Sequence, residues 1–184
     1  MMAETATRSL VPLVQAALFS AVAIGGGFGL VFIPNIEVIS VIVFLSGVTL
    51  GVRWGFIVGV VSETVFSVMN PLGSGLLFPP LLVAQITGFA IIGITGGLTR
   101  RLFWHTGFSP SRRLQAGVFG VLLTFVYDTL TTLSYPVSVG MDWQSTTGVY
   151  LTGMALVFIH ILSNFFVFSL AVPLVIPPLV HRYV

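Results

Sequence analysis

The number of membrane crossings in this chain is decided by the stretch Leu45–Gly55, LSGVTLGVRWG. Apolar residues continue on both sides of it, so residues 37–69 could be interpreted as one long helix. Gly51-Val52-Arg53 interrupts this run, and an arginine is costly at the centre of a bilayer. We therefore predict a tight turn here between two short helices, which brings the number of apolar segments to six.

Turn signals also bound the other segments: Pro34-Asn35 follows the first, Asn70-Pro71-Leu72-Gly73 the third and Pro177-Pro178 the last. The six helices are predicted at residues 10–32, 37–51, 54–69, 80–98, 114–137 and 148–175. Each crossing needs about 20 residues, so little of the chain is left for anything but short loops. The prediction is an all-α membrane protein with one integral membrane domain over residues 1–184.

Composition supports a membrane environment. The chain is 56% hydrophobic and 7% charged, whereas soluble domains are roughly 25% charged. It has no lysine and no cysteine, which excludes a P-loop lysine, a Schiff base, a thiolate nucleophile and a disulfide. The first apolar run lacks a cleavage signal and is interpreted as a retained helix. We predict no catalytic residues, cofactor, metal site or nucleic-acid partner.

The arginines predict the orientation of the chain in the membrane. With a cytoplasmic amino terminus and six crossings, all seven fall on the cytoplasmic side, where short loops retain positive charge. They are Arg8, Arg53, Arg100, Arg101, Arg112, Arg113 and Arg182. The opposite orientation would place all of them outside, and five crossings would scatter them over both faces. We therefore predict a multi-pass protein of the inner (cytoplasmic) cell membrane with both termini in the cytoplasm.

Small residues recur every fourth position in the first predicted helix and so share one face. They are Ala17, Ala21, Gly25 and Gly29. Small residues let two membrane helices approach closely. The stripe is therefore either a seam against another helix of this chain or a docking face for a separate membrane partner. The glycines of the fourth segment, Gly93, Gly96 and Gly97, could form the internal seam instead.

Polar side chains concentrate in the outer half of the predicted bundle, on several different helices. This asymmetry predicts a cavity that opens to the outside and binds a small polar ligand. The candidate substrate-binding residues are Asn35, Glu37, Asn70, Gln85, Tyr127, Asp128, Thr131, Tyr135, Trp143 and His160. No arginine is expected there to hold an anion, so a neutral or cationic ligand is favoured. Tyr127, Tyr135 and Trp143 offer it aromatic faces.

Two other interpretations of the polar residues stay open. Each residue could simply satisfy a neighbouring helix, for example Glu63, near mid-membrane, with His160. A membrane enzyme that uses Glu63, Asp128 and His160 is disfavoured, because no recognised spacing joins them.

Several motifs resemble one family of membrane proteins. They are ALFSA at Ala17–Ala21, IPNIE at Ile33–Glu37, the stretch Leu45–Gly55 and the glycines that end in Gly96-Gly97-Leu98. Together with six short helices, they resemble the substrate-binding S-components of energy-coupling factor (ECF) vitamin transporters. The resemblance covers essentially the whole chain.

The resemblance implies a protein that binds one vitamin or related micronutrient from outside. It also implies partners: a transmembrane coupling protein and two ATP-binding subunits, with Ala17 and Ala21 in contact with the coupling protein. We extend this docking prediction to Gly25. Ligands of thiamine-like, riboflavin-like, queuosine-precursor-like or cobalamin-like chemistry suit the expected charge. The alternative is a membrane scaffold like the cell-shape protein MreD, which would use the stripe for assembly and have no ligand cavity.

Overall fold

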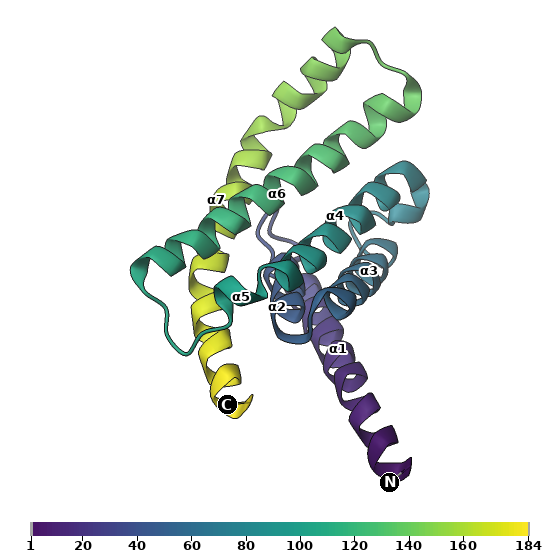
Figure 1. Ribbon diagram of the computed structural model, residues 1–184. Coiled ribbons are helices and arrows are strands. Elements are labelled where there is room, and N and C mark those ends of the chain that lie inside the picture. The colour runs from purple at the N-terminus through teal and green to yellow at the C-terminus, as the bar shows by residue number, and fades with distance from the viewer. Residues whose placement is uncertain (1, 184) are drawn as a thin grey trace.

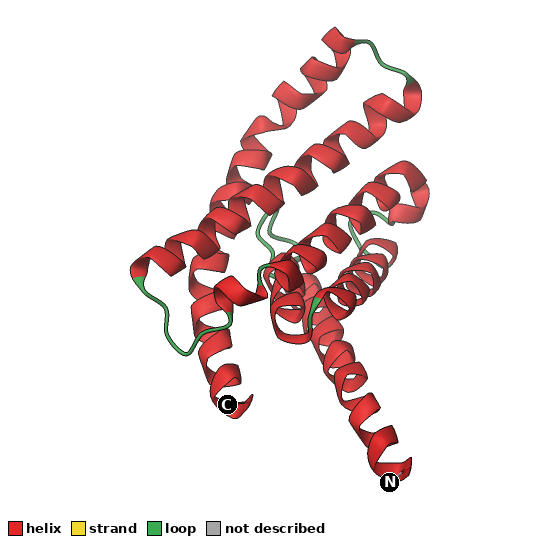
Figure 2. Ribbon diagram, in the orientation of Figure 1, coloured by secondary structure: helices red, strands yellow, loops and turns green. Residues whose placement is uncertain are grey.

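The computed structural model describes residues 2–183, with side chains for residues 10–182, and this part of the chain is helical with no strand. The elements are α1 (Met2–Leu30), α2 (Ile39–Leu50), α3 (Val52–Val68), the 3-10 turn η1 (Gly75–Leu77), α4 (Pro79–Leu98), α5 (Arg100–Phe103), α6 (Pro110–Val139) and α7 (Trp143–Tyr183) (Figures 1 and 2). The prediction of an all-helical protein is thus confirmed for the described residues.

Four helices are long and apolar enough to cross a membrane, namely α1 from Leu10, α4, α6 and α7. The structure is therefore that of a membrane protein. Helix α2 is apolar but has only 12 residues, and α3 has 17 and includes Arg53 and Glu63. Six crossings remain a prediction.

Helix α2 forms the centre of the bundle. Ten of its residues are buried, and it packs against α1, α3, α4 and α7. The Phe44 ring lies 5.5 Å from that of Phe103 in α5 and 5.3 Å from that of Phe168 in α7. Because every face of α2 meets another element, it can be apolar all round.

The turn between α2 and α3 is shorter than predicted. Helix α2 ends at Leu50 and α3 begins at Val52, so the chain reverses at Gly51 alone. Gly51 has a φ of 92°, a conformation that residues with a Cβ rarely adopt. Val52 and Arg53 belong to α3.

Helices α2, α3 and α4 meet through glycines, with backbone against backbone. A Cβ added to Gly55 would lie 2.7 Å from the Gly47 Cα, and one added to Gly93 would collide with the carbonyl group of Gly55. Gly96 is in similar contact with the backbone of Phe44, and Gly97 with that of Val52. The internal seam of the bundle is therefore built from these glycines of α2, α3 and α4.

The small-residue stripe of α1 is not part of that seam. Ala17, Ala21, Gly25 and Gly29 are exposed, and a Cβ on Gly25 or Gly29 would meet no atom within 4 Å. The buried face of α1, which packs on α2 and α3, carries a different set: Ala16, Ser20, Ala23 and Gly27. The interpretation of the stripe as an internal seam is therefore wrong.

Helices α6 and α7 form a long hairpin that extends beyond α4 in Figure 1. The turn is closed by Gly140 in the left-handed region, with a φ of 67°, and by Asp142, whose carboxylate accepts the Ser145 N–H at 2.8 Å. The backbone and side-chain hydrogen bonds from Ser145 hold the pKa of this exposed carboxyl below its ordinary value.

The predicted end of the last helix at residue 175 is wrong, because α7 continues through Pro177 and Pro178 to Tyr183. A proline inside a helix removes a backbone hydrogen bond. Here the helix is held by its buried face, since side chains at four-residue spacing are at most 4% exposed: Phe168, Val172, Ile176 and Val180.

Candidate functional site

A cavity of about 560 Å³ lies between the end of α1, the α1–α2 loop, α3, α4, α6 and α7. The parts of these helices that line it are the carboxyl-terminal ends of α1 and α3, the start of α4, the later half of α6 and the first half of α7. All of these lie towards the end of the bundle opposite the two chain termini (Figure 1). A volume of this size suits a drug-sized or vitamin-sized molecule.

Eight of the ten residues predicted from depth and polarity line this cavity: Asn35, Glu37, Asn70, Gln85, Tyr127, Asp128, Thr131 and His160. Tyr135 and Trp143 do not. The Tyr135 ring packs 5.9 Å from that of Phe78, and Trp143 is 82% exposed at the start of α7. Both residues lie near the turn of the α6–α7 hairpin, beyond the parts of the two helices that line the cavity.

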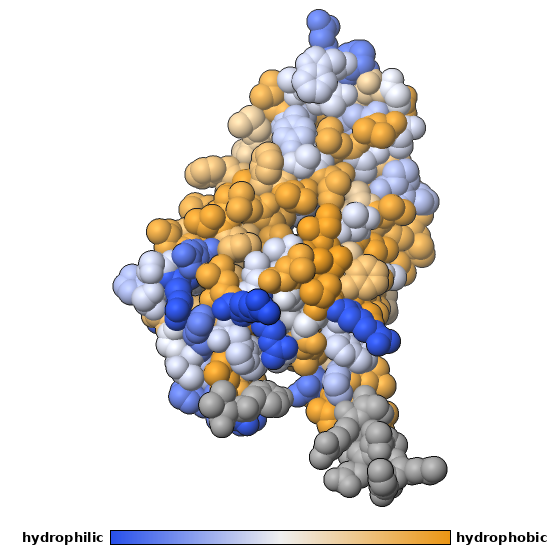
Figure 3. Space-filling model, in the orientation of Figure 1, coloured by the Kyte–Doolittle hydropathy of each residue, from blue (hydrophilic) through white to orange (hydrophobic). Residues whose placement is uncertain are grey.

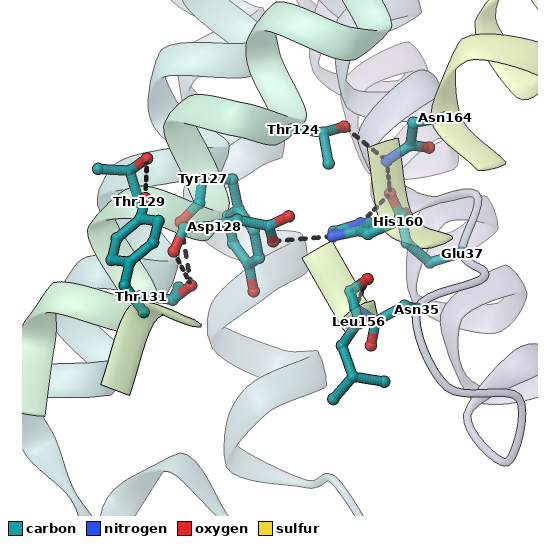
Figure 4. A network of polar contacts seen from close by, with 11 residues as sticks. Asn35, Glu37, Thr124, Tyr127, Asp128, Thr129, Thr131, Leu156, His160 and Asn164 are labelled. Carbon is teal, nitrogen blue, oxygen red and sulfur yellow. Dashed lines mark hydrogen bonds and ion pairs between the residues drawn. The ribbon is translucent and has the colours of Figure 1, made fainter. Parts of the chain in front are cut away.

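His160 is the centre of a buried polar network (Figure 4). Its Nδ1 lies 2.8 Å from Asp128 Oδ1 on α6, and its Nε2 lies 3.6 Å from Glu37 Oε1 in the α1–α2 loop. An ionised carboxylate only accepts hydrogen bonds, so Nδ1 donates to Asp128. The imidazole is therefore held between two carboxylates from different parts of the chain.

Glu37 is fixed from two further sides. The Asn164 amide on α7 donates to Glu37 Oε1 at 2.9 Å and also to the Thr124 hydroxyl on α6 at 2.9 Å. The Ser40 N–H, in the first turn of α2, donates to Glu37 Oε2 at 2.8 Å. A carboxylate at a helix amino terminus is also favoured by the helix dipole. Glu37 thus joins the α1–α2 loop to the α6–α7 hairpin.

Asn35 makes a second link between the loop and the hairpin. Its amide donates to the Leu156 carbonyl on α7 at 2.7 Å. Asn35 is also the one non-glycine residue with a positive φ, 59°, among the described residues, and asparagine tolerates this conformation better than most residues. The loop is therefore held across one wall of the cavity.

Glu63 on α3 lies beneath the cavity and is 1% exposed. Ser67, one turn later, donates to Glu63 Oε1 at 2.6 Å, and its oxygen lies 3.1 Å from Gln85 Oε1 on α4. Glu63 Oε2 has no hydrogen-bond partner. The structure therefore pairs His160 with Asp128 and Glu37. The pairing of His160 with Glu63, considered in the sequence analysis, is not found.

None of three comparisons, with protein-family models, with curated proteins and with solved structures, finds a match. The resemblance to vitamin-transport subunits therefore stays a prediction. Within residues 10–182, no group of three or more His, Asp or Glu side chains is arranged to hold a metal ion. What the cavity offers a ligand is hydrogen-bonding side chains, apolar walls and aromatic rings.

Several residues of the site are absent from the predicted list, among them Thr124, Asn164, Phe66 and Phe89. Thr124 and Asn164 lie one helical turn from Asp128 and His160, and this four-residue spacing on one face was a usable signal. Phe66 and Phe89 line the cavities beside Glu63. No sequence signal separates them from the other phenylalanines, of which the chain has 16 in all.

Proposed function

We propose that this protein is the substrate-binding subunit of an ECF-type transporter, with the S-component architecture of six crossings and both termini in the cytoplasm. It captures a vitamin or related micronutrient, neutral or cationic, from outside the cell. It then delivers the ligand in complex with a transmembrane coupling protein and two ATP-binding subunits.

The observation that carries this proposal is the cavity itself. Polar residues from the α1–α2 loop, from Asn70 after α3 and from the three helices α4, α6 and α7 converge on one space of about 560 Å³. Asp128 Oδ2 in this network has no hydrogen-bond partner, and His160 Nε2 has only the ion pair with Glu37 at 3.6 Å, which is too long for a hydrogen bond. Buried polar groups are nearly always hydrogen-bonded, so these atoms are suited to a ligand that supplies the missing partners.

The distribution of charge supports the orientation. Six arginines belong to the start of α3, to α5, to the start of α6 and to the end of α7, and these parts lie towards the end of the bundle that holds both termini (Figure 1). Hydrophilic surface is visible over this end in Figure 3, below a broad hydrophobic zone. The Arg100 guanidinium lies 4.8 Å from the centre of the Trp104 ring, and tryptophan is typical of a membrane interface.

The exposed stripe of α1 supports docking of a membrane partner. Ala17, Ala21 and Gly25 leave a shallow surface of small residues, with larger exposed side chains such as Leu18 and Val22 beside it. A partner helix could approach the α1 backbone closely here. The coupling protein is the partner that the proposed function requires at this surface.

The stripe alone would equally favour a scaffold of the MreD type. Only the transport function requires a ligand cavity, whereas a scaffold does not need a space lined with unpaired polar atoms. Affinity purification from cells of origin separates them by the partners recovered: ATP-binding subunits for the transporter, or cell-wall synthesis proteins for the scaffold.

Thermal unfolding in detergent tests the binding function directly. A panel of vitamins, vitamin precursors and modified bases is screened, and at least one compound is expected to raise the melting temperature. Asp128→Ala and Gln85→Ala should reduce that rise, whereas Asp142→Ala, which removes a carboxylate outside the cavity, should keep it. The proposal is in error if no compound in the panel shifts melting, or if the cavity variants respond as the wild type does.

A further inference from the structure

A recess of about 70 Å³ lies behind the main cavity. The two spaces share Glu37, Phe66, Tyr127 and His160 as lining residues, so the recess adjoins the inner end of the main cavity. A single water molecule needs only about 10–15 Å³ by this measure. The recess therefore has room for the head group of a ligand whose body occupies the larger space.

Glu63 gives the recess an unpaired carboxylate oxygen. The side chain lines the recess and is 1% exposed, and while Ser67 bonds Oε1, Oε2 has no partner. A buried carboxylate without a full set of partners is energetically costly. The missing partner is a hydrogen-bond donor or a positive charge.

The chain itself supplies too little positive charge at this place. No arginine lines either space, and the chain has no lysine. Glu37 and Glu63 line the recess together with His160, and the imidazole of His160 is already engaged by Asp128 and Glu37. The inner end of the cavity therefore offers a ligand acidic side chains and no arginine or lysine.

The recess is also lined by Ile39 and by three aromatic rings, those of Phe66, Phe89 and Tyr127. The Phe89 and Tyr127 rings meet edge to face, with their centres 5.2 Å apart. The faces of aromatic rings attract cations, and cages of such rings are a known device for binding organic ammonium groups. A carboxylate with a free oxygen inside an aromatic enclosure is the complement of a cationic nitrogen.

We propose that the recess binds a positively charged nitrogen of the ligand, as a protonated amine or an organic ammonium, against Glu63 and between the rings of Phe66, Phe89 and Tyr127. This inference rests on the proposed function and narrows its substrate class from neutral or cationic to cationic. The uncharged part of the ligand lies in the main cavity, against the apolar side chains that line its walls.

Two probes of nearly equal shape test the inference: benzylammonium and the neutral benzyl alcohol. Binding to the purified full chain in detergent is measured by thermal shift over a concentration series at neutral pH. Benzylammonium is expected to stabilise the wild type and benzyl alcohol to do so much less. Glu63→Gln, which keeps the shape and cannot ionise, should weaken benzylammonium binding roughly tenfold, the effect of one hydrogen bond to a charged group.

Asp142→Asn is the matched control, because it removes the charge of an exposed carboxylate far from the recess, and it should bind both probes as the wild type does. Equal stabilisation by the two probes, no stabilisation by benzylammonium, or an unchanged response in Glu63→Gln would overturn the inference. If Glu63→Gln does not fold, the inference is tested by whether the wild type binds benzylammonium in preference to benzyl alcohol.

The ligand that co-purifies with the protein separates this inference from the proposed function. A neutral micronutrient in the cavity would refute the cation site and leave the proposed function standing. A cationic compound whose binding is lost in Glu63→Gln would support both.

Discussion

The glycine seam of α2, α3 and α4 and the polar cavity wall of α6, α7 and the α1–α2 loop are held together in opposite ways. In the seam, backbones touch at Gly47, Gly55 and Gly93 with no space for a methyl group. In the cavity wall, the elements are joined by side-chain hydrogen bonds through Glu37, Asn164 and His160. The first arrangement is dry and closely packed, and the second encloses a space.

This difference shows how a small membrane bundle combines rigidity with a binding site. Between membrane helices, close packing supplies much of the stability, and the glycine seam supplies it on one side. The other side then carries polar groups that would be unfavourable in a packed interface. We expect substitutions in the seam to act on folding, and substitutions in the cavity wall to act on both folding and ligand binding.

The largest effect is expected from Gly93→Ala in the seam. The new Cβ would collide with the backbone of Gly55, and a backbone atom cannot move aside as a flexible side chain can. We predict a loss of about 3 kcal/mol or more in the free energy of unfolding, at the upper end of the effects of overpacking. The measurement is reversible unfolding in detergent.

Gly25→Ala is the matched control for this substitution, because a Cβ there meets no atom within 4 Å. Its stability should equal or slightly exceed that of the wild type, since alanine favours a helix more than glycine does. Equal stabilities for the two alanine variants would show that the seam is not the close backbone contact described.

Asn164→Ala should have the next largest effect. It removes the hydrogen bonds from one amide to Glu37 and to Thr124, and it leaves buried acceptors unsatisfied. We predict a loss of about 2 kcal/mol in unfolding free energy, measured in the same way. Asn70→Ala is the control, because the Asn70 side chain bonds only the nearby Leu72 N–H in an exposed turn; a similar loss in both variants would contradict a special role for Asn164.

Asn35→Gly tests the link between the loop and α7 with a smaller effect. Glycine keeps the left-handed backbone conformation and removes the hydrogen bond to the Leu156 carbonyl, so a loss of about 1 kcal/mol is expected. Asn35→Ala should cost about 1 kcal/mol more, because alanine disfavours a φ of 59°. If the two variants are equally stable, the backbone conformation of the loop contributes nothing measurable.

The smallest effect on stability is expected on the exposed stripe. Ala17→Leu and Ala21→Leu add bulk to an exposed surface, so the free energy of unfolding should change by less than about 0.5 kcal/mol. Assembly with the coupling protein should instead be lost in co-purification, whereas Val22→Leu, on a neighbouring exposed position, should assemble normally. If the stripe variants assemble normally, the docking surface lies elsewhere on the protein.

Much of the fold followed from simple patterns. Apolar segments and turn signals indicated where the helices lie. The continuation of the last helix through Pro177 and Pro178 could not be predicted from local sequence. Proline predicts a helix end, and only the tertiary packing of Val172, Ile176 and Val180 offsets it. The exposure of the α1 stripe also depended on tertiary structure, because spacing shows which residues share a face and not what the face meets.

The cavity could be predicted in part because polar residues at membrane depth are energetically unfavourable and usually face a cavity or a partner. Depth and polarity were enough to select Gln85, Asp128 and His160 without knowledge of their partners. The particular pairing of His160 with Asp128 and Glu37 depends on side-chain positions fixed by three separate elements, which no local pattern contains. Phe66 and Phe89 carry no polar group, so nothing in the sequence distinguished them from core residues.

Mass spectrometry of small molecules released from the purified wild-type protein tests the central claim most directly. We predict one compound in near-stoichiometric amount, absent or strongly reduced in preparations of Asp128→Ala and present in Asp142→Ala. A wild-type protein that carries no such compound and whose melting no micronutrient shifts would contradict the account of this chain as a ligand-binding subunit.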